Sequence, residues 1–367
     1  MNDQKRYLVG FNLVKGIGAV TLQKLLRFFG NAQSAWMASA DALMQSGLST
    51  TVIERLLETR SYGVLDRIWE RIEKEHITLL TVEDDGYPKY LREIPKPPPV
   101  LYVKGTLKKE DDWAVAVVGT RRVTAYGKQV ALQVSGTLAH SGITIVSGLA
   151  RGVDAAAHSA ALDAGGRTIA VLGCGVDLVY PPEHRILAER IQENGALISD
   201  YPPGTPPEAK NFPPRNRIIS GIARAVLVIE AGRKSGALIT ARFAAEQGRD
   251  VFAVPGNIFA PQSRGTNALI QQGARPLLQP KDVLDVLDMT MIAEQQMACT
   301  VLPGNAAEAQ LYDLLNHEPM HIDEIMVKTD LSIDEVSSAL AMMELKGMVR
   351  QVGGMRYVVL RDEEASY

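Results

Sequence analysis

The residues most suited to chemistry are basic side chains in glycine-containing turns, each directly after a short apolar segment. A guanidinium or ammonium group beside free backbone N–H groups binds phosphate. A further basic segment, residues 210–217, also contains Phe212, whose ring can either stack on a flat ligand group or fill the core beside Pro213. One phosphate needs fewer cations, so we expect a large polyanionic ligand. The candidate residues are Gly119, Thr120, Arg121, Arg122, Ser147, Gly148, Arg151, Lys210, Phe212, Arg215, Asn216, Arg217, Arg233, Lys234, Ser235 and Gly236.

These turns are positioned by a regular alternation of apolar segments with helical stretches. Short apolar strands that alternate with helices predict a parallel sheet with helices on both faces, that is, an α/β, Rossmann-like domain. In such sheets ligands bind at the carboxyl ends of the strands, where all of these turns lie. The expected strands are residues 114–118, 143–146, 168–172, 196–199, 225–229 and 251–254.

The chain of 367 residues is too long for one ordinary core. A proline-rich stretch, residues 86–103, and a second break at residues 289–305 suggest the boundaries. We expect a helical domain at residues 1–85, the Rossmann-like domain at 86–290, a linker at 291–306 and a small domain at 307–367. Val100–Val103 is expected to form the first edge strand of the Rossmann-like domain.

Gly16-Ile17-Gly18 lies between two helical patterns near the start of the chain. This arrangement resembles a helix-hairpin-helix (SAM-like) unit, whose turn can direct N–H groups at a DNA phosphate. A weaker copy occupies residues 41–57 and turns at Ser46-Gly47-Leu48. A small packing module, in which the glycines only permit tight turns, explains the pattern equally well.

The last 60 or so residues (307–367) predict a winged helix, with helices at 308–315, 322–328 and 333–346 and a hairpin at 348–359. Winged helices often bind DNA through the third helix. Here that helix carries Asp334, Glu335 and Glu344, and only Lys346 near its end. Acidic charge facing phosphates is unfavourable, so we favour a protein contact or an auxiliary role.

The evidence for an enzyme is weaker. Asp154 and His158 share one helix face and could form an acid–base pair, but a structural role is favoured. Glu230 is expected to anchor a neighbouring turn, and Cys174 to be a small buried residue rather than a nucleophile. Neither the dinucleotide signature nor the P-loop signature is present, and no metal-ligand spacing appears, so we expect no catalytic residue, cofactor or metal.

The net charge of −3 means that an anion site must come from local clustering of basic residues. No apolar run approaches the roughly 18 residues of a membrane span. Two widely separated cysteines and a polar amino terminus fit a reducing compartment, so we expect a cytoplasmic protein without a membrane partner.

Six ordered motifs resemble those of the DNA-processing protein DprA (Smf) family. The resemblance implies an extended Rossmann fold, flanked by helix-hairpin-helix-like and winged-helix modules, that binds single-stranded DNA. It also implies homodimers and a non-enzymatic recombination mediator that protects incoming single strands and loads the RecA recombinase during natural transformation. The motifs are GTRRVTAYG, SGLARGVDAAAH, VLGCGVDLVYPPEH, NFPPRNRIISGIARAVLVIEA, SGALITARFAAEQGRDVFAVPGN and GTNALIQQGA.

The resemblance also assigns roles to particular residues. It places Arg121, Lys210 and Phe212 in the basic pocket of the family, and the helix of residues 266–272, with Leu269 and Ile270, at the subunit contact. The alternative is a Rossmann enzyme that acts on a nucleotide, similar to a phosphoribohydrolase.

Overall fold

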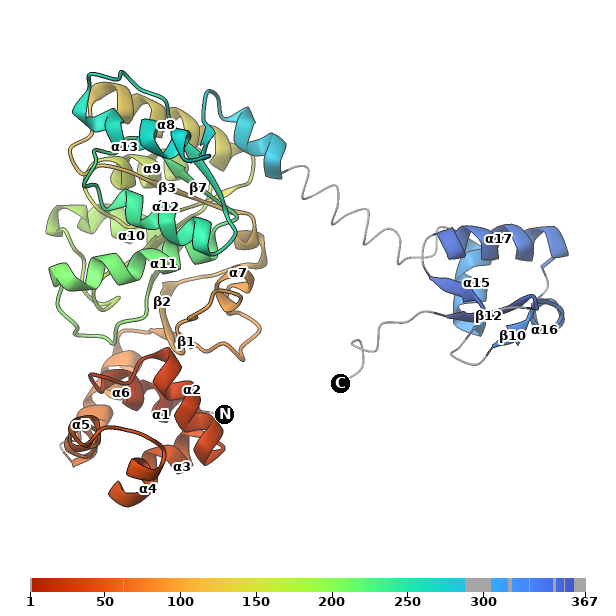
Figure 1. The fold of residues 1–367 in the computed structure, drawn as a ribbon, viewed down its shortest axis with the longest axis horizontal. Helices are drawn as coiled ribbons and strands as arrows, with labels where there is room; N and C mark the ends of the chain where they lie inside the picture. Colours follow the sequence, from red (N-terminus) through yellow and green to blue (C-terminus); the bar gives the residue numbers. More distant parts are fainter. Residues whose placement is uncertain are drawn as a thin grey trace. The chain divides into compact units, whose positions relative to one another are not determined.

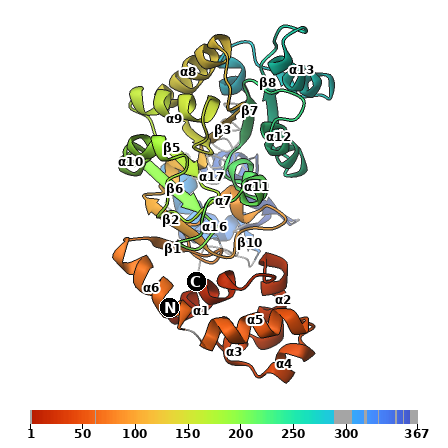
Figure 2. The ribbon, with the colours of Figure 1, turned by 90° about the vertical axis from the view of Figure 1, so that its left-hand side faces the viewer.

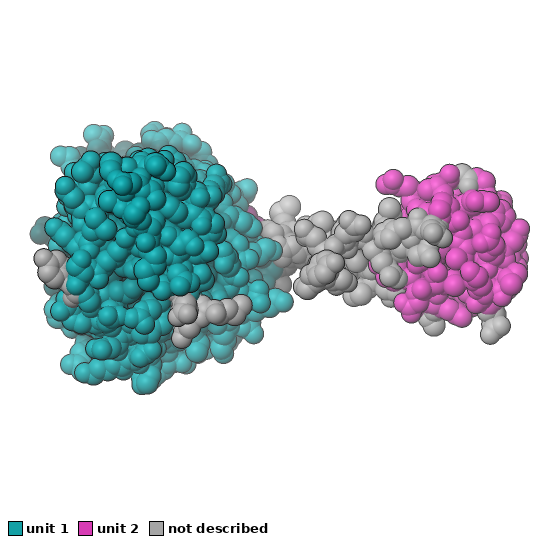
Figure 3. Space-filling view, turned by 90° about the horizontal axis from the view of Figure 1, so that it is seen from below, with its two compact units in different colours: residues 1–284 teal, residues 285–367 magenta. Residues whose placement is uncertain are grey.

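The computed structural model describes residues 2–61, 63–287, 305–315, 319–329, 331–345, 348–352 and 354–359. The chain divides into two compact units, residues 1–284 and 285–367, which Figure 3 colours separately. Each unit is described by itself. Residues 291–304 of the predicted linker (291–306), which include Cys299, lie outside the described residues, as do Lys346 and Gly353.

A nine-stranded sheet forms the centre of the first unit in the described part of the chain (Figure 1), in the order β1-β2-β6-β5-β4-β3-β7-β8-β9. The seven strands from β6 to β9 in that order run parallel, whereas β1 and β2 are antiparallel to their neighbours. The strands are β1 (Thr78–Leu80), β2 (Leu101–Gly105), β3 (Ala114–Val118), β4 (Thr144–Ser147), β5 (Thr168–Val171), β6 (Gly195–Ser199), β7 (Ala225–Val228), β8 (Asp250–Ala253) and β9 (Arg275–Pro276).

Helices cover both faces of the sheet, as the alternating pattern predicts (Figure 2). One face packs against α8 (Ala125–His140), α9 (Val153–Asp163) and α10 (Arg185–Glu193). The other packs against α7 (Lys89–Arg92), α11 (Phe212–Ile222) and α12 (Ala237–Glu246), and α13 (Arg264–Gln271) lies beside β8. Side chains of β5 alternate between two cores: Ile169 faces α11, and Ala170 faces α10.

The edge of the sheet differs from the prediction. Val100–Val103 was expected to begin an edge strand, but β2 is covered by β1, with Leu79 opposite Tyr102. The edge strand β1 contains only three residues, which is too short for a periodic pattern to reveal. It also lies before residue 86, so the sheet begins earlier in the chain than we expected.

Helices α1–α6 precede the sheet, with both predicted helical turns in place. They enclose a core that includes Leu22, Trp36 and Tyr102 of β2, and the Tyr102 hydroxyl donates to Asn12 Oδ1 at 3.0 Å. Gly16 has a φ of 108°, and a Cβ there would lie 2.8 Å from a Val52 methyl group. The packing thus accounts for this glycine, and phosphate binding by the turn stays a prediction. The helices are α1 (Asn2–Leu13), α2 (Ala19–Phe29), α3 (Ala32–Met37), α4 (Ala40–Gln45), α5 (Thr50–Ser61) and α6 (Val64–Lys74).

The second unit is a winged helix. Its helices α15 (Ala306–Leu314), α16 (Ile322–Lys328) and α17 (Ile333–Leu345) match the three predicted ones. In the described residues they pack with a three-stranded sheet of β10 (Met320–His321), β12 (Arg356–Val359) and β11 (Val349–Gln351), of which the two-residue β10 was not predicted. Asp334 and Glu335 lie in the first turn of α17, as expected.

Candidate nucleic-acid interface

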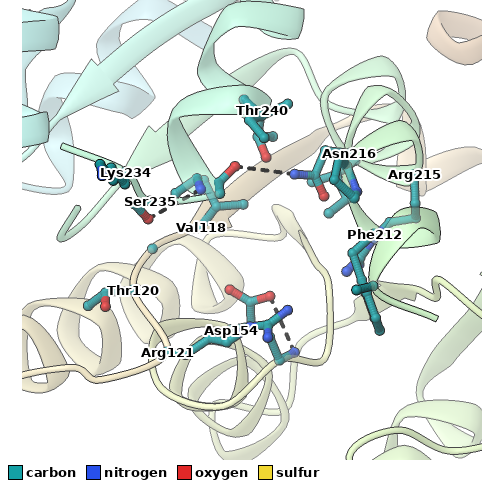
Figure 4. Close-up of a pocket in the computed structure, with 18 of the residues that line it drawn as sticks. Val118, Thr120, Arg121, Asp154, Phe212, Arg215, Asn216, Lys234, Ser235 and Thr240 are labelled. Atoms are coloured by element: carbon teal, nitrogen blue, oxygen red, sulfur yellow. Dashed lines mark hydrogen bonds between the residues drawn. The ribbon is translucent and has the colours of Figure 1, made fainter. Parts of the chain in front are cut away.

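A pocket of about 900 Å³ opens at the carboxyl ends of β3 and β7, where the order of the strands reverses (Figure 4). This reversal is the usual ligand site of open α/β sheets. The pocket is walled by the turns after β3 and β7 and by the first turns of α9, α11 and α12. The predicted residues that line it are Gly119, Thr120, Arg121, Arg122, Phe212, Arg215, Asn216, Lys234, Ser235 and Gly236.

The turn that carries Arg121 is held in place by Glu230, at the end of β7. The Thr120 amide donates to the Glu230 carbonyl at 2.7 Å, and the amide and hydroxyl of Thr124 donate to its carboxylate at 2.9 and 2.8 Å. Thr124 also caps α8 through the Gly127 amide. The prediction that Glu230 anchors a turn is therefore confirmed.

We expect Glu230→Ala to lower the free energy of unfolding by about 1.5–3 kcal/mol, because buried hydrogen bonds to a charged group contribute that much. Glu230 is only 4% exposed, so its partners would be left without an acceptor. Urea unfolding monitored by circular dichroism measures the change. Glu246→Ala, which removes an exposed carboxylate on α12, is the matched control. Equal midpoints for the two variants would contradict the anchoring role.

An arginine–aromatic cluster forms one side of the pocket. Arg121 is exposed, and its Cζ lies 5.5 Å from the centre of the Phe212 ring. On the same ring, the Tyr180 side chain stacks at a tilt with centroids 5.7 Å apart. Figure 4 shows Phe212 and Arg121 among the side chains that line the pocket. Sequence reasoning missed Tyr180, although an aromatic residue close after a glycine turn at a strand end was a usable signal.

Arg215 lines the pocket, but little of its side chain is accessible to a ligand. It is only 4% exposed, and its guanidinium donates to the Val171 carbonyl beneath the pocket. Gly148 leaves room for this group, because a Cβ there would overlap the guanidinium. Burial lowers the pKa of Arg215 to about 10, so the guanidinium stays charged at neutral pH. The negative charge of Asp154 is the main influence that opposes this decrease. Arg215 therefore supports the pocket floor.

Asp154 complements this buried cation. Its carboxylate accepts from the amides of Gly148 at 3.1 Å and Ala150 at 3.3 Å. Burial raises the pKa of the Asp154 carboxyl, against the attraction of Arg215 and these two amides. Figure 4 shows Asp154 at the base of the pocket, with a dashed line that marks its hydrogen bond to a backbone amide.

Other predicted residues lie outside the main pocket. Arg217 forms an ion pair with Asp200 at 2.7 Å. Ser147 is fully buried and donates to the Val117 carbonyl. Neither side chain is placed to contact a ligand directly.

Gly148 and Arg151 line a small adjoining recess beside Phe212. The exposed cations of Arg151 and Lys210 pair with Glu183 and Glu208, with which a ligand would have to compete.

The turn after β7 supplies the opposite wall. Arg233 and Lys234 are exposed and have no ion pair among the described residues. The Ser235 hydroxyl accepts from the Ala237 amide at 3.3 Å, and the Asn216 side chain donates to the Gly236 carbonyl at 3.3 Å. This wall also contains the amino terminus of α12, whose dipole favours a negative ligand.

The candidate enzymatic groups have structural roles. His158 is fully buried, its Nδ1 lies 2.7 Å from Thr168 Oγ1, and burial lowers its pKa to about 3. Burial raises the pKa of Cys174 to about 11, which opposes formation of a thiolate. Within the described ranges, no group of three or more His, Cys, Asp and Glu residues could hold a metal ion, and no helix is long and apolar enough to cross a membrane.

Comparison with known proteins agrees with this architecture. A family model described as DNA recombination-mediator protein A matches residues 78–288, and one described as DprA winged helix domain matches residues 300–355. Protein Smf of Synechocystis sp. is 38% identical over 393 residues, which cover 97% of this chain and 99% of the relative.

Two solved structures are also similar. DNA processing protein A from Streptococcus pneumoniae has a TM-score of 0.68 at 36% identity, over 76% of this chain and 97% of that one. DNA processing protein A from Helicobacter pylori, described as having a unique single-stranded DNA binding mode, has a TM-score of 0.53 at 32% identity, over 59% and 98% of the two chains. The predicted extended Rossmann-like fold with its winged helix is thus confirmed, and the chain belongs to the DNA recombination-mediator protein A family, also called DprA or Smf.

Proposed function

We propose that this protein binds single-stranded DNA in the pocket and acts in the cytoplasm as a recombination mediator rather than an enzyme. The observation that carries the proposal is the contact of exposed Arg121 with the Phe212 ring, opposite Lys234, which has no ion pair in the described part of the chain. Arginine and lysine can neutralise phosphates, and an aromatic ring can stack on any base. A site of this composition binds a single strand without reading its sequence.

The same proposal includes a role in natural transformation, in which the protein protects incoming single strands and loads RecA onto them. Membership of the family supports this role. We expect the purified protein to speed RecA assembly on single-stranded DNA, and a protein that binds DNA without any effect on RecA would contradict this part of the proposal alone.

The alternative, a nucleotide-acting Rossmann enzyme, needs a general acid or base facing its substrate. Of the described residues that line the pocket, Asp154 is the only carboxylate, and it is engaged by two backbone amides. A nucleotide-turnover assay and a DNA-binding assay on one preparation separate the two functions. We expect binding without turnover, and turnover that is lost with Asp154→Asn would favour the enzyme.

Removing the winged helix should leave most of the affinity for single-stranded DNA. The pocket belongs entirely to the first compact unit, and the acidic first turn of α17 is unfavourable beside phosphates. The test compares the full chain with a chain ending at Leu287 by fluorescence anisotropy on a labelled oligonucleotide. A shortened chain that folds but no longer binds would assign the DNA contact to the second unit.

We further propose that the protein forms a homodimer through α13. Leu269 packs against the sheet core, whereas Ile270 does not belong to that core. In a two-fold contact the same surface of each subunit meets its copy, so one substitution appears twice in the interface. We therefore expect Ile270→Glu to give a folded monomer and Leu269→Glu a destabilised protein, because a charge packed against the apolar core is costly. Light scattering and thermal melts distinguish them, and two folded, dimeric variants would exclude α13 as the interface.

A further inference from the structure

Two large apolar side chains project from the loop between β8 and α13. Phe259 is 80% exposed and Ile258 is 72% exposed. Isolated exposed apolar residues are common, but an adjacent exposed pair that includes an aromatic ring beside a candidate binding site calls for a partner. Among the described residues of the first unit, no side chain covers the Phe259 ring.

The loop holds these side chains in a defined position. Asn257 Oδ1 accepts from the Phe259 amide at 2.9 Å, and the Asn257 carbonyl accepts from the Ala260 amide at 3.0 Å. At its base, the Asn267 side chain exchanges hydrogen bonds of 3.1 and 3.0 Å with the main chain of Gly256. The exposed aromatic ring therefore belongs to a built turn.

The loop adjoins the wall of the pocket. Strand β8 pairs with β7 in parallel, so the loops that follow them leave the same edge of the sheet. The Gly265 amide donates to the Ala231 carbonyl at 2.8 Å, and a Cβ on Gly232 would lie 3.4 Å from the Pro261 carbonyl. Gly232 itself lines the pocket. The loop therefore lies next to the wall of the pocket that carries Lys234.

The charge around the loop identifies the kind of partner. Residues 251–281 contain no aspartate or glutamate. Arg264 and Arg233 are exposed and have no ion pair in the described residues, whereas Arg242 and Arg275 pair with neighbouring carboxylates. If two copies of this loop faced each other directly, Arg233 and Arg264 beside it would approach their own copies, which is unfavourable. A polyanion with flat apolar faces fits both the charge and the ring.

We infer that Phe259 is a second base-stacking platform for single-stranded DNA, on the path that continues from the pocket over the loop of residues 255–263. The inference rests on the proposed function and extends it. Phe212 and Phe259 would hold two separate bases, while Arg233, Lys234 and Arg264 neutralise the phosphates between them.

The test uses the full-length protein and labelled oligothymidylates of increasing length, with fluorescence anisotropy as the readout. Phe259→Ala should bind the shortest oligomers as wild type does and long oligomers at least about fivefold more weakly, the factor at the lower end of what one stacked base contributes. Phe259→Trp should restore the affinity, with its fluorescence quenched only by long oligomers. Met37→Ala, which removes an exposed apolar side chain from α3, is the control.

Three outcomes would contradict this inference. A wild-type affinity for Phe259→Ala at every length removes the platform and leaves the pocket intact. An equal loss at all lengths makes Phe259 part of the pocket rather than a second site. A change in mass by light scattering would make the loop a contact between subunits. If the wild-type protein binds no single-stranded DNA, the proposed function itself fails.

Discussion

Replacing Arg121 by alanine should remove most of the affinity of the protein for single-stranded DNA. Arg121 is exposed, has no carboxylate partner among the described residues, and lies over the Phe212 ring. The variant loses both a phosphate contact and a cation that orients the stacking ring. We expect the slope of log affinity against log salt to fall by about 0.7 for one lost phosphate on a single strand. Anisotropy titrations at several salt concentrations measure both changes.

The companion variant, Phe212→Ala, should weaken binding by about 1–3 kcal/mol while leaving the salt slope unchanged, because stacking is uncharged. Since the two side chains contact each other, the double variant should lose less than the sum of the single losses. Arg185→Ala removes a 79% exposed arginine on α10 and serves as the control for net charge. A slope that falls equally for Arg121→Ala and Arg185→Ala would show that only net charge matters.

Arg215→Ala should produce the largest loss of stability. It removes a buried cation that donates to the Val171 carbonyl and lies near the buried Asp154 carboxylate. Breaking one side of such a buried charge arrangement costs about 3–5 kcal/mol. Urea unfolding should therefore show a much lower midpoint, and Arg190→Ala, which removes a surface arginine on α10, should not.

A double variant tests the cause of that loss. Arg215→Met with Asp154→Asn removes both charges and keeps comparable volume and an amide oxygen for the Gly148 and Ala150 amides. We expect it to regain part of the stability that Arg215→Ala loses. If Arg215→Ala unfolds like the wild-type protein and yet loses affinity for DNA, Arg215 is a DNA contact, as its place in the sequence first suggested.

Much of the site was predictable because it depends on local sequence. Apolar strands followed by glycine turns placed Arg121, Lys234 and the start of α11 at one edge of the sheet, and the structure brings them into one pocket. Glu230 was recognisable because a carboxylate at a strand end can accept hydrogen bonds from the next turn. These inferences need only the order of elements and the direction of parallel strands.

What the sequence could not show is where long side chains point. Arg215, Asn216 and Arg217 are consecutive in the sequence, and from the sequence all three side chains were equally good candidates for a ligand contact. Arg217 is taken by Asp200, and Arg215 is buried near Asp154, 61 positions earlier in the chain. Such partners depend on the packing of distant elements, which no local pattern encodes. The strand β1 was missed for a different reason: its three residues are too few to form a recognisable pattern.

The most direct test of a single-strand binding pocket compares single-stranded and duplex DNA of one sequence, bound by the full-length protein over a series of salt concentrations. We expect tighter binding of the single strand at every concentration, with an affinity that decreases as salt rises and a preference that Phe212→Ala reduces, because stacked bases are accessible only in the single strand. Equal affinity for both forms, unaffected by Phe212→Ala, would contradict the account.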